Sequence, residues 1–194
     1  MWAGGYYPAP SITDIIDFIT IAQTGNAVDF GDASNAYQNG FAGASPTRGV
    51  FAGGRQSPTY LNVIEFITFT TTGDAQDFGD LSVGKRGGPN GTASNSTRMI
   101  LPGEDKSGDT ITNVIEFLTI ATTGNSTDFG DMTESIYICS ACAALTTNRV
   151  VNGAGRDGSG IYDKTQYVDS ATTGNATEGF SFFDDMQSPG AFSG

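Results

Sequence analysis

Histidine is absent from this chain of 194 residues, and cysteine occurs only twice. Without histidine the chain cannot form a Ser-His or Cys-His catalytic pair, and it lacks the imidazole ligands of a protein copper site. Basic residues are also scarce, because 9 lysines and arginines stand against 21 acidic residues, for a net charge of −12. That charge repels phosphate backbones and anionic lipid surfaces, so we expect neither nucleic acid nor a membrane as partner.

Long apolar runs are missing as well. No run approaches the roughly 18 apolar residues that a membrane helix needs. The first residues, MWAGGYYPAP, show no basic stretch followed by an apolar core. The sequence therefore predicts no membrane span and no secretion signal.

The two cysteines form a Cys-x-x-Cys motif at Cys139 and Cys142. A structural zinc needs about four ligands, and a thioredoxin-type motif needs a helix start beside a βαβ unit. The flanking letters IYICSACAAL instead indicate a strand, so we interpret these cysteines as packing residues or free thiols. A strained local disulfide and a metal site shared between subunits are the alternatives. We predict no structural metal and no cofactor.

What the chain does contain is a repeat. Four similar stretches read TDIIDFITIAQTGNAVDFGD from Thr13, LNVIEFITFTTTGDAQDFGD from Leu61, TNVIEFLTIATTGNSTDFGD from Thr112 and, more loosely, YDKTQYVDSATTGNATEGF from Tyr162. Their turn glycines are 48, 51 and 50 residues apart: Gly25, Gly73, Gly124 and Gly174. This period is typical of a β-propeller blade rather than of a helical repeat.

The apolar part of the repeat predicts a strand. In VIEFITFT, β-branched and aromatic residues run up to a Thr-Gly turn signal. Ile64 and Phe66 would point to one face and Ile67 and Phe69 to the other, with only Glu65 interrupting the pattern. Such a strand must be covered on both faces, as stacked blades or a sandwich would cover it.

A short amphipathic helix is the alternative for this stretch, because Ile15, Ile16, Phe18 and Ile19 also fit helical spacing. The β-branched content and the Thr-Gly ending oppose a helix. Abundant glycine (27 residues) and a low charged fraction (15%) also fit many short strands joined by turns. We therefore predict an all-β fold.

Each unit also has an earlier strand with the pattern basic residue, apolar run, glycine pair. It reads RGVFAGG from Arg48, RMILPGE from Arg98 and RVVNGAG from Arg149, with a partial copy, MWAGG, at the start. Cut at this strand, the chain forms a single repeat domain of four units, about 1–47, 48–97, 98–148 and 149–194. We expect the segment after each DFGD to hold the remaining strands.

An apolar strand ending in a glycine pair, a variable loop and a strand with an aromatic residue resemble the Kelch type of propeller blade. The usual tryptophan is missing, and Phe30, Phe78 and Phe129 are expected in its place. The combination of SPTRGVFAGG (45–54) with NVIEFITFTTTGDAQDFGDLS (62–82) further resembles repeats in virion structural proteins of tailed phages of marine bacteria, including cyanophages. The copies at 113–133 and 171–177 extend this resemblance over most of the chain.

The resemblance implies a four-unit propeller, or an open propeller-like array or trimeric fibre built from the same repeats. It implies a non-enzymatic structural or interaction protein in the capsid surface, tail or fibre of a virion, with other virion proteins or copies of itself as partners. Binding residues are expected in the variable loops 31–46, 84–97 and 132–148. The alternative is a module that binds a host surface glycan or receptor by stacking Tyr6, Tyr7, Tyr37 and Tyr60 on sugars.

Three motifs invite chemistry but have simpler explanations. The triplets at Asp29, Asp77 and Asp128 spell the kinase Asp-Phe-Gly without its companion motifs, so we predict a buried Phe between polar residues. The glycine pattern 153–158 matches a dinucleotide fingerprint, yet the next repeat strand follows where a helix would be needed. The paired aspartates favour solvated turns that accept backbone N–H bonds, with weak calcium binding as the minority interpretation; they are Asp29/Asp32, Asp77/Asp80 and Asp128/Asp131. We assign no catalytic, cofactor or metal residue.

The closure of the repeats yields one further prediction. Residues Trp2–Gly5 match the glycine-pair strand, but the segment that precedes this strand in the other units has no counterpart before Met1. The segment 186–194 follows the last Phe-Phe-Asp-Asp. We expect it to pair beside Trp2–Gly5 and to place Phe192 near that strand, in the same chain or in a neighbouring one.

Overall fold

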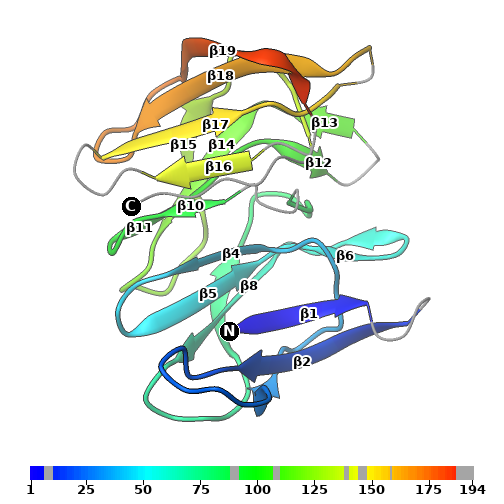
Figure 1. Cartoon of the computed structure of the whole chain (residues 1–194), viewed down its shortest axis with the longest axis vertical. Helices are drawn as coiled ribbons and strands as arrows, with labels where there is room; N and C mark the ends of the chain where they lie inside the picture. The colour runs from blue at the N-terminus through cyan, green and yellow to red at the C-terminus, as the bar shows by residue number, and fades with distance from the viewer. Residues whose placement is uncertain are drawn as a thin grey trace.

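Strands are the only regular secondary structure in the residues that the computed structural model describes, which are 1–6, 11–87, 92–106, 110–137, 140–143, 148–157 and 159–186. Most of them form four antiparallel sheets of three or four strands that follow one another along the chain (Figure 1). The all-β class is therefore confirmed. The stretch for which a helix was the alternative is a strand, Ile12–Phe18.

Each sheet is an antiparallel meander whose strands pair in chain order. Sheet 1 contains β1 (Trp2–Tyr6), β2 (Ile12–Phe18) and β3 (Val28–Asp32). Sheet 2 contains β4 (Phe41–Ala44), β5 (Arg48–Ala52), β8 (Val63–Thr68) and β9 (Gln76–Asp80). Sheet 3 contains β10 (Ala93–Ser94), β11 (Arg98–Leu101), β14 (Val114–Thr119) and β15 (Thr127–Asp131). Sheet 4 contains β16 (Ser140–Ala143), β17 (Arg149–Gly153), β18 (Tyr162–Asp169) and β19 (Thr177–Met186).

Two short hairpins extend from the loops between the second and third strands of sheets 2 and 3. They are β6 (Arg55–Gln56) with β7 (Thr59–Tyr60), and β12 (Glu104–Lys106) with β13 (Thr110–Thr112). These loops are the parts of the repeat that vary in length and letters, so a hairpin at this position does not disturb the sheets.

The segment after each DFGD supplies the first strand of the following sheet. Strand β4 comes after the first DFGD but pairs with β5, and β10 and β16 pair in the same way with β11 and β17. The sheets thus span 2–32, 41–80, 93–131 and 140–186, which is out of phase with units cut at the glycine-pair strand. This exchange ties consecutive units together through main-chain hydrogen bonds.

The strand predicted from VIEFIT packs on both faces, as expected, but Phe69, which was predicted to share a covered face with Ile67, lies beyond β8 and is 40% exposed. Ile64 and Phe66 belong to the apolar cluster shared with sheet 3, whereas Ile67 belongs to the cluster shared with sheet 1. Because neighbouring side chains on a strand alternate between faces, β8 can contribute to both clusters. Strand β8 therefore packs against sheet 3 on one face and against sheet 1 on the other.

A β-bulge lies opposite this strand in each of the first three sheets. The pairing shifts between Ile64 and Glu65, where Gly79 and Asp77 are the partners and Phe78 is the extra residue. The same shift occurs at Ile16/Asp17 and Ile115/Glu116. The extra residue bends the last strand of each of these sheets, which we call the outer strand. The glycine of its DFGD motif has a positive φ.

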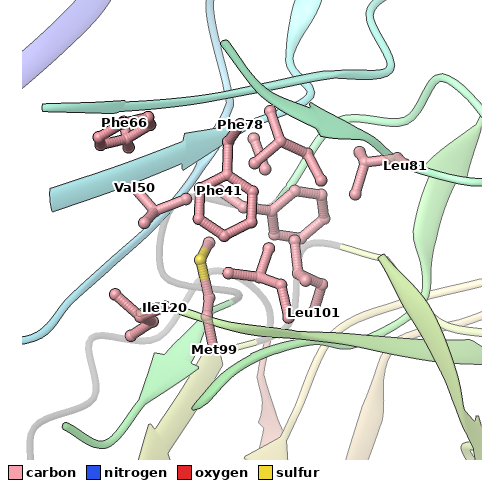
Figure 2. Close-up of a cluster of buried hydrophobic side chains, with 11 residues drawn as sticks. Phe41, Val50, Phe66, Phe78, Leu81, Met99, Leu101 and Ile120 are labelled. Carbon is pink, nitrogen blue, oxygen red and sulfur yellow. The ribbon is translucent and has the colours of Figure 1, made fainter. Parts of the chain in front are cut away.

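Three apolar clusters fill the spaces between consecutive sheets. The middle cluster joins sheet 2 to sheet 3, and Figure 2 shows Phe41, Val50, Phe66 and Phe78 facing Met99, Leu101 and Ile120. The cluster between sheets 1 and 2 is built around Phe30 and Ile67, and the cluster between sheets 3 and 4 around Phe129 and Val168. Sheet-on-sheet burial is thus the main stabilising term, and it recurs at each step of the array.

The first strands of sheets 2, 3 and 4, which we call the inner strands, lie next to one another: they are β4, β10 and β16. Strand β10 lies beside both β4 and β16, while sheet 1 is at the bottom of Figure 1 and sheet 4 at the top. The segment 187–194, with Phe192, lies outside the described residues. The closure prediction therefore stays a prediction.

Candidate functional site

The Thr-Gly turn of each later sheet contacts the outer strand of the sheet before it. The turn glycine donates its N–H to a phenylalanine carbonyl at 2.7 Å in all three cases: Gly73 to Phe30, Gly124 to Phe78 and Gly174 to Phe129. Two residues later a second N–H donates at 2.8–2.9 Å: Ala75 to Asp32, Ser126 to Asp80 and Ala176 to Asp131. We call this recurring set of contacts the inter-sheet joint.

Polar side chains add two more hydrogen bonds to each inter-sheet joint. The residue after the turn glycine accepts an N–H from the DFGD strand at 3.0–3.1 Å: Asp74 from Asp32, Asn125 from Asp80 and Asn175 from Asp131. A buried polar side chain at the equivalent position of β8, β14 and β18 accepts an N–H from the residue two positions after the preceding DFGD strand: Glu65 from Ser34 (2.9 Å), Glu116 from Ser82 (3.0 Å) and Gln166 from Thr133 (2.7 Å). These buried acceptors are therefore satisfied by the neighbouring sheet.

Glycine is required in the DFGD strand because the next turn approaches it closely. Gly79 has φ +149°, and a Cβ built there would lie 2.5 Å from the carbonyl carbon and oxygen of Gly124. Gly130 has φ +142° and the same 2.5 Å approach to Gly174. Only glycine combines this backbone angle with the absence of a Cβ.

A buried ion pair strengthens the joint between sheets 2 and 3. Lys85 Nζ lies 2.7 Å from Glu116 Oε2, and both side chains are almost fully buried. Burial by itself raises the pKa of the Glu116 carboxyl, but the charge and hydrogen bond of Lys85, with donors from Ser126 and Ser82, hold the net pKa below its ordinary value. Sheet 4 has neutral Gln166 in the place of Glu116, so its joint needs no such cation.

The arginines that open the glycine-pair strands of sheets 2 and 3 also reach the next sheet. The guanidinium carbons of Arg48 and Arg98 lie 4.5 and 4.7 Å from the centroids of Phe66 and Phe117. Arg48 Nη1 donates to the carbonyl of Ala121 at 3.0 Å, and Arg98 Nη1 donates to that of Ser170 at 2.7 Å. The recurring arginine was visible in the sequence, but no sequence pattern indicated its hydrogen bond to a carbonyl of the following sheet.

We expect Arg98→Ala to lower the free energy of unfolding by about 2 kcal/mol, because it removes a charge-assisted hydrogen bond and a cation–π contact. Arg149→Ala is the matched control, since Arg149 lies over Tyr167 at 4.1 Å and makes no carbonyl bond among the described residues. The control should lose about 0.5–1 kcal/mol. Urea unfolding of both variants measures the difference, and equal losses would contradict the role of the carbonyl bond.

The DFGD strands contain both the triplets and the aspartate pairs. The phenylalanines of the three DFGD strands, Phe30, Phe78 and Phe129, are buried, as predicted. Asp29 and Asp128 each accept the N–H of the glycine two residues later, at 3.1 and 3.2 Å, which agrees with our main interpretation. In the described part of the chain, no group of three or more acidic or cysteine side chains could hold a metal ion.

The glycine pattern at 153–158 leads into a local turn and then into β18, not into a helix. Asp157 accepts hydrogen bonds from the N–H groups of Ser159 and Gly160 and from Tyr162 Oη, at 2.6, 2.8 and 2.7 Å. The bonds from Tyr162 and Ser159 hold the pKa of the Asp157 carboxyl well below its usual range. The Asp157 carboxylate thus already accepts the backbone N–H groups that a bound phosphate would need as donors.

Of the Cys-x-x-Cys motif, Cys142 lies in β16 opposite Val151, as the strand interpretation predicted. Cys139 lies outside the described residues. The interpretation of the cysteines as packing residues or free thiols stays a prediction.

Two of the four tyrosines proposed for sugar stacking were wrongly expected to be exposed. Tyr37 and Tyr60 are buried, whereas Tyr6 is exposed and Tyr7 lies outside the described residues. Burial, with the nearby Glu65 carboxylate, raises the pKa of the Tyr37 phenol far above its ordinary value. Both rings therefore support the fold rather than present a ligand surface.

The segments 31–46, 84–97 and 132–148 are less free than the term variable loop implies. They supply the inner strands β4, β10 and β16. They also place buried side chains between the sheets, among them Phe41, Lys85 and Ile136. The expectation of binding residues in these segments stays a prediction.

No family model and no curated protein sequence matches this chain. No helix in the described residues is long and apolar enough to cross a membrane.

Proposed function

We propose that the chain is a non-enzymatic structural and interaction protein of a tailed-phage particle, located in the capsid surface, tail or fibre. Its sheets would be Kelch-like propeller blades arranged around the line of β4, β10 and β16. The meander order of the sheets and the adjacency of these inner strands support the blade assignment. The virion assignment rests on the resemblance of the SPTRGVFAGG and NVIEFITFTTTGDAQDFGDLS stretches to virion repeats.

One observation carries the structural role. In sheets 2, 3 and 4 the recurring polar residues make hydrogen bonds to the preceding sheet, as Glu65, Glu116 and Gln166 do. A catalytic site would instead require polar groups that converge on a cleft and meet a substrate. Sheets whose polar side chains are used in hydrogen bonds to one another form a rigid scaffold, and this supports a role in presenting surfaces to protein partners.

Quantitative mass spectrometry of purified particles of a phage that encodes this chain tests the proposal. We expect the protein at a fixed, high copy number relative to the major capsid or tail subunits, and we expect antibody labelling to place it on one part of the particle. Absence from washed particles would contradict a virion role.

Recognition of a host surface glycan or receptor is the second candidate function. The exposed rings of Trp2 and Tyr6 favour it, because aromatic faces stack on sugars. Binding on a glycan array that Tyr6→Ala abolishes, without incorporation into particles, would support this alternative instead.

A further inference from the structure

Sheet 1 carries one half of an inter-sheet joint that has no partner in the described residues. Gly25, Asn26 and Ala27 stand where Gly73, Asp74 and Ala75 stand in sheet 2, and Asp17 stands where Glu65 stands. In sheets 2, 3 and 4 the turn donors and acceptors bond to the preceding DFGD strand, and the counterparts of Asp17 accept an N–H from the residue two positions after it. Within the described part of the chain, no hydrogen bond engages the corresponding groups of sheet 1.

The apolar positions of the same face are also uncovered. Trp2 pairs with Asp17 as Phe51 pairs with Glu65 and Leu101 with Glu116, so these three side chains are structurally equivalent. Trp2 is 58% exposed, whereas Phe51 and Leu101 are buried against the preceding sheet. Likewise Ile19 is 41% exposed, while its counterparts Ile67, Leu118 and Val168 are buried. We call this surface, formed by Trp2, Asp17, Ile19 and residues 24–27, the open face of sheet 1.

Sheet 4 lacks the complementary half of the inter-sheet joint. Glu178 pairs with Gln166 as Asp128 pairs with Glu116, which puts Phe180 in the place of Gly130. Phe180 does not share the positive φ of Gly31, Gly79 and Gly130, and its side chain is 64% exposed. Phe180 thus lacks both features that let the next turn approach Gly130 so closely, the positive φ and the absence of a Cβ, so sheet 4 does not present the surface to which such a turn docks in this chain.

We propose that the open face of sheet 1 binds a repeat of the same type from outside these 194 residues, one whose outer strand carries Asp-Phe-Gly-Asp. A second copy of this chain does not qualify, because sheets 1, 2 and 3 have their DFGD strands engaged and sheet 4 presents Phe180. The inter-sheet joint inside the chain defines the geometry that the partner must match. This inference deepens the proposed interaction function by naming the partner, and its test needs no phage particle, so the two can fail separately.

The unique tryptophan makes the proposal measurable. We would fuse a second copy of residues 41–100 to the N-terminal side of Trp2. Ile100 of the added copy then precedes Trp2, just as Ile100 precedes Leu101, the residue equivalent to Trp2, in the native chain. The added copy brings a DFGD strand with Gly79 and contains no tryptophan, because Trp2 is the only one. We expect a blue shift of Trp2 emission and a several-fold lower acrylamide quenching constant than in the unextended chain. A folded extension, judged by its added strand signal in circular dichroism, that leaves Trp2 equally quenchable would overturn the proposal.

Two variants control for effects other than docking. Gly79→Phe in the added copy alone introduces the residue type that stands at the equivalent position of sheet 4, and its Cβ would collide with the docking turn as a Cβ at Gly79 does; it should return Trp2 to the quenching of the unextended chain. Ala27→Pro removes one donor of the open face, so it should destabilise the extended chain more than the unextended one. Equal effects in the two chains, or a concentration-dependent blue shift in the unextended chain, would show that another surface covers Trp2.

Discussion

Gly79→Ala is expected to lower the free energy of unfolding by about 3–5 kcal/mol, through backbone strain together with lost hydrogen bonds of the inter-sheet joint. Alanine is strained at φ +149°, and its Cβ would collide with the Gly124 peptide at 2.5 Å. Main-chain atoms cannot move aside as a flexible side chain can, so the turn of sheet 3 must withdraw. Guanidinium unfolding monitored by circular dichroism gives the loss.

Gly124→Ala and Gly25→Ala are the matched controls. Gly124 has φ +156° but no neighbour within 4 Å of a built Cβ, so alanine there should lose only about 1 kcal/mol from backbone strain. Gly25 has neither a left-handed φ nor a neighbour within 4 Å, so alanine should be nearly neutral. If Gly79→Ala were no worse than Gly124→Ala, the close approach of the sheets would not be a source of stability.

Lys85→Met is expected to destabilise the protein by about 3–5 kcal/mol, because it leaves the buried Glu116 carboxylate without its cation. The ammonium of Lys85 lies 2.7 Å from Glu116 Oε2 in the joint between sheets 2 and 3. Lys164→Met is the control, because Lys164 pairs with Glu178 at 3.4 Å on the surface with both side chains at least half exposed. An exposed pair should contribute less than about 1 kcal/mol.

The double variant Lys85→Met with Glu116→Gln should recover part of the loss. Glutamine still accepts the Ser82 N–H, as Gln166 accepts the Thr133 N–H at the equivalent place in sheet 4. Failure of the double variant to exceed Lys85→Met in stability would mean that the lysine acts through packing and not through charge. Urea unfolding at neutral pH separates these outcomes.

Acidification provides an independent test of the same pair. The folded-state pKa of Glu116 lies below its ordinary value of 4.5, so its stabilising contribution is complete above that value and is lost as the pH falls through the folded value. Wild-type protein should therefore lose more stability below pH 4.5 than the double variant, which has no titrating group at this position. Parallel acid profiles would contradict the assignment.

Periodicity and turn chemistry were readable from the sequence because they depend on near neighbours. The strand VIEFIT, the Thr-Gly turn and the buried Phe of DFGD all appear in the structure where local patterns placed them. Glu65 looked like an interruption of an apolar strand, since its partner, the N–H of Ser34, belongs to the preceding sheet. A pairing across 31 residues leaves no local mark in the sequence.

Exposure was the property that local pattern predicted least well. Tyr37 and Tyr60 lie in polar, glycine-rich segments, yet the stacking of sheets buries both. Lys85 stands in a polar loop beside Arg86, and the joint between sheets 2 and 3 encloses it with Glu116. Burial is a sum over surfaces that the chain brings together from distant positions, so residue type alone sets only a preference.

The sequence by itself determined the all-β class, the repeat period and the residues that each repeat reuses, because strand and turn preferences act over a few residues. Only the tertiary structure decided that the segment after each DFGD joins the following sheet and that Gly79 must lack a Cβ. It also decided that Trp2 and Ile19 of sheet 1 stay exposed and that Phe180 takes the register position of the DFGD glycine in sheet 4. These outcomes depend on distances between main-chain atoms of separate sheets, which are fixed only when the sheets pack.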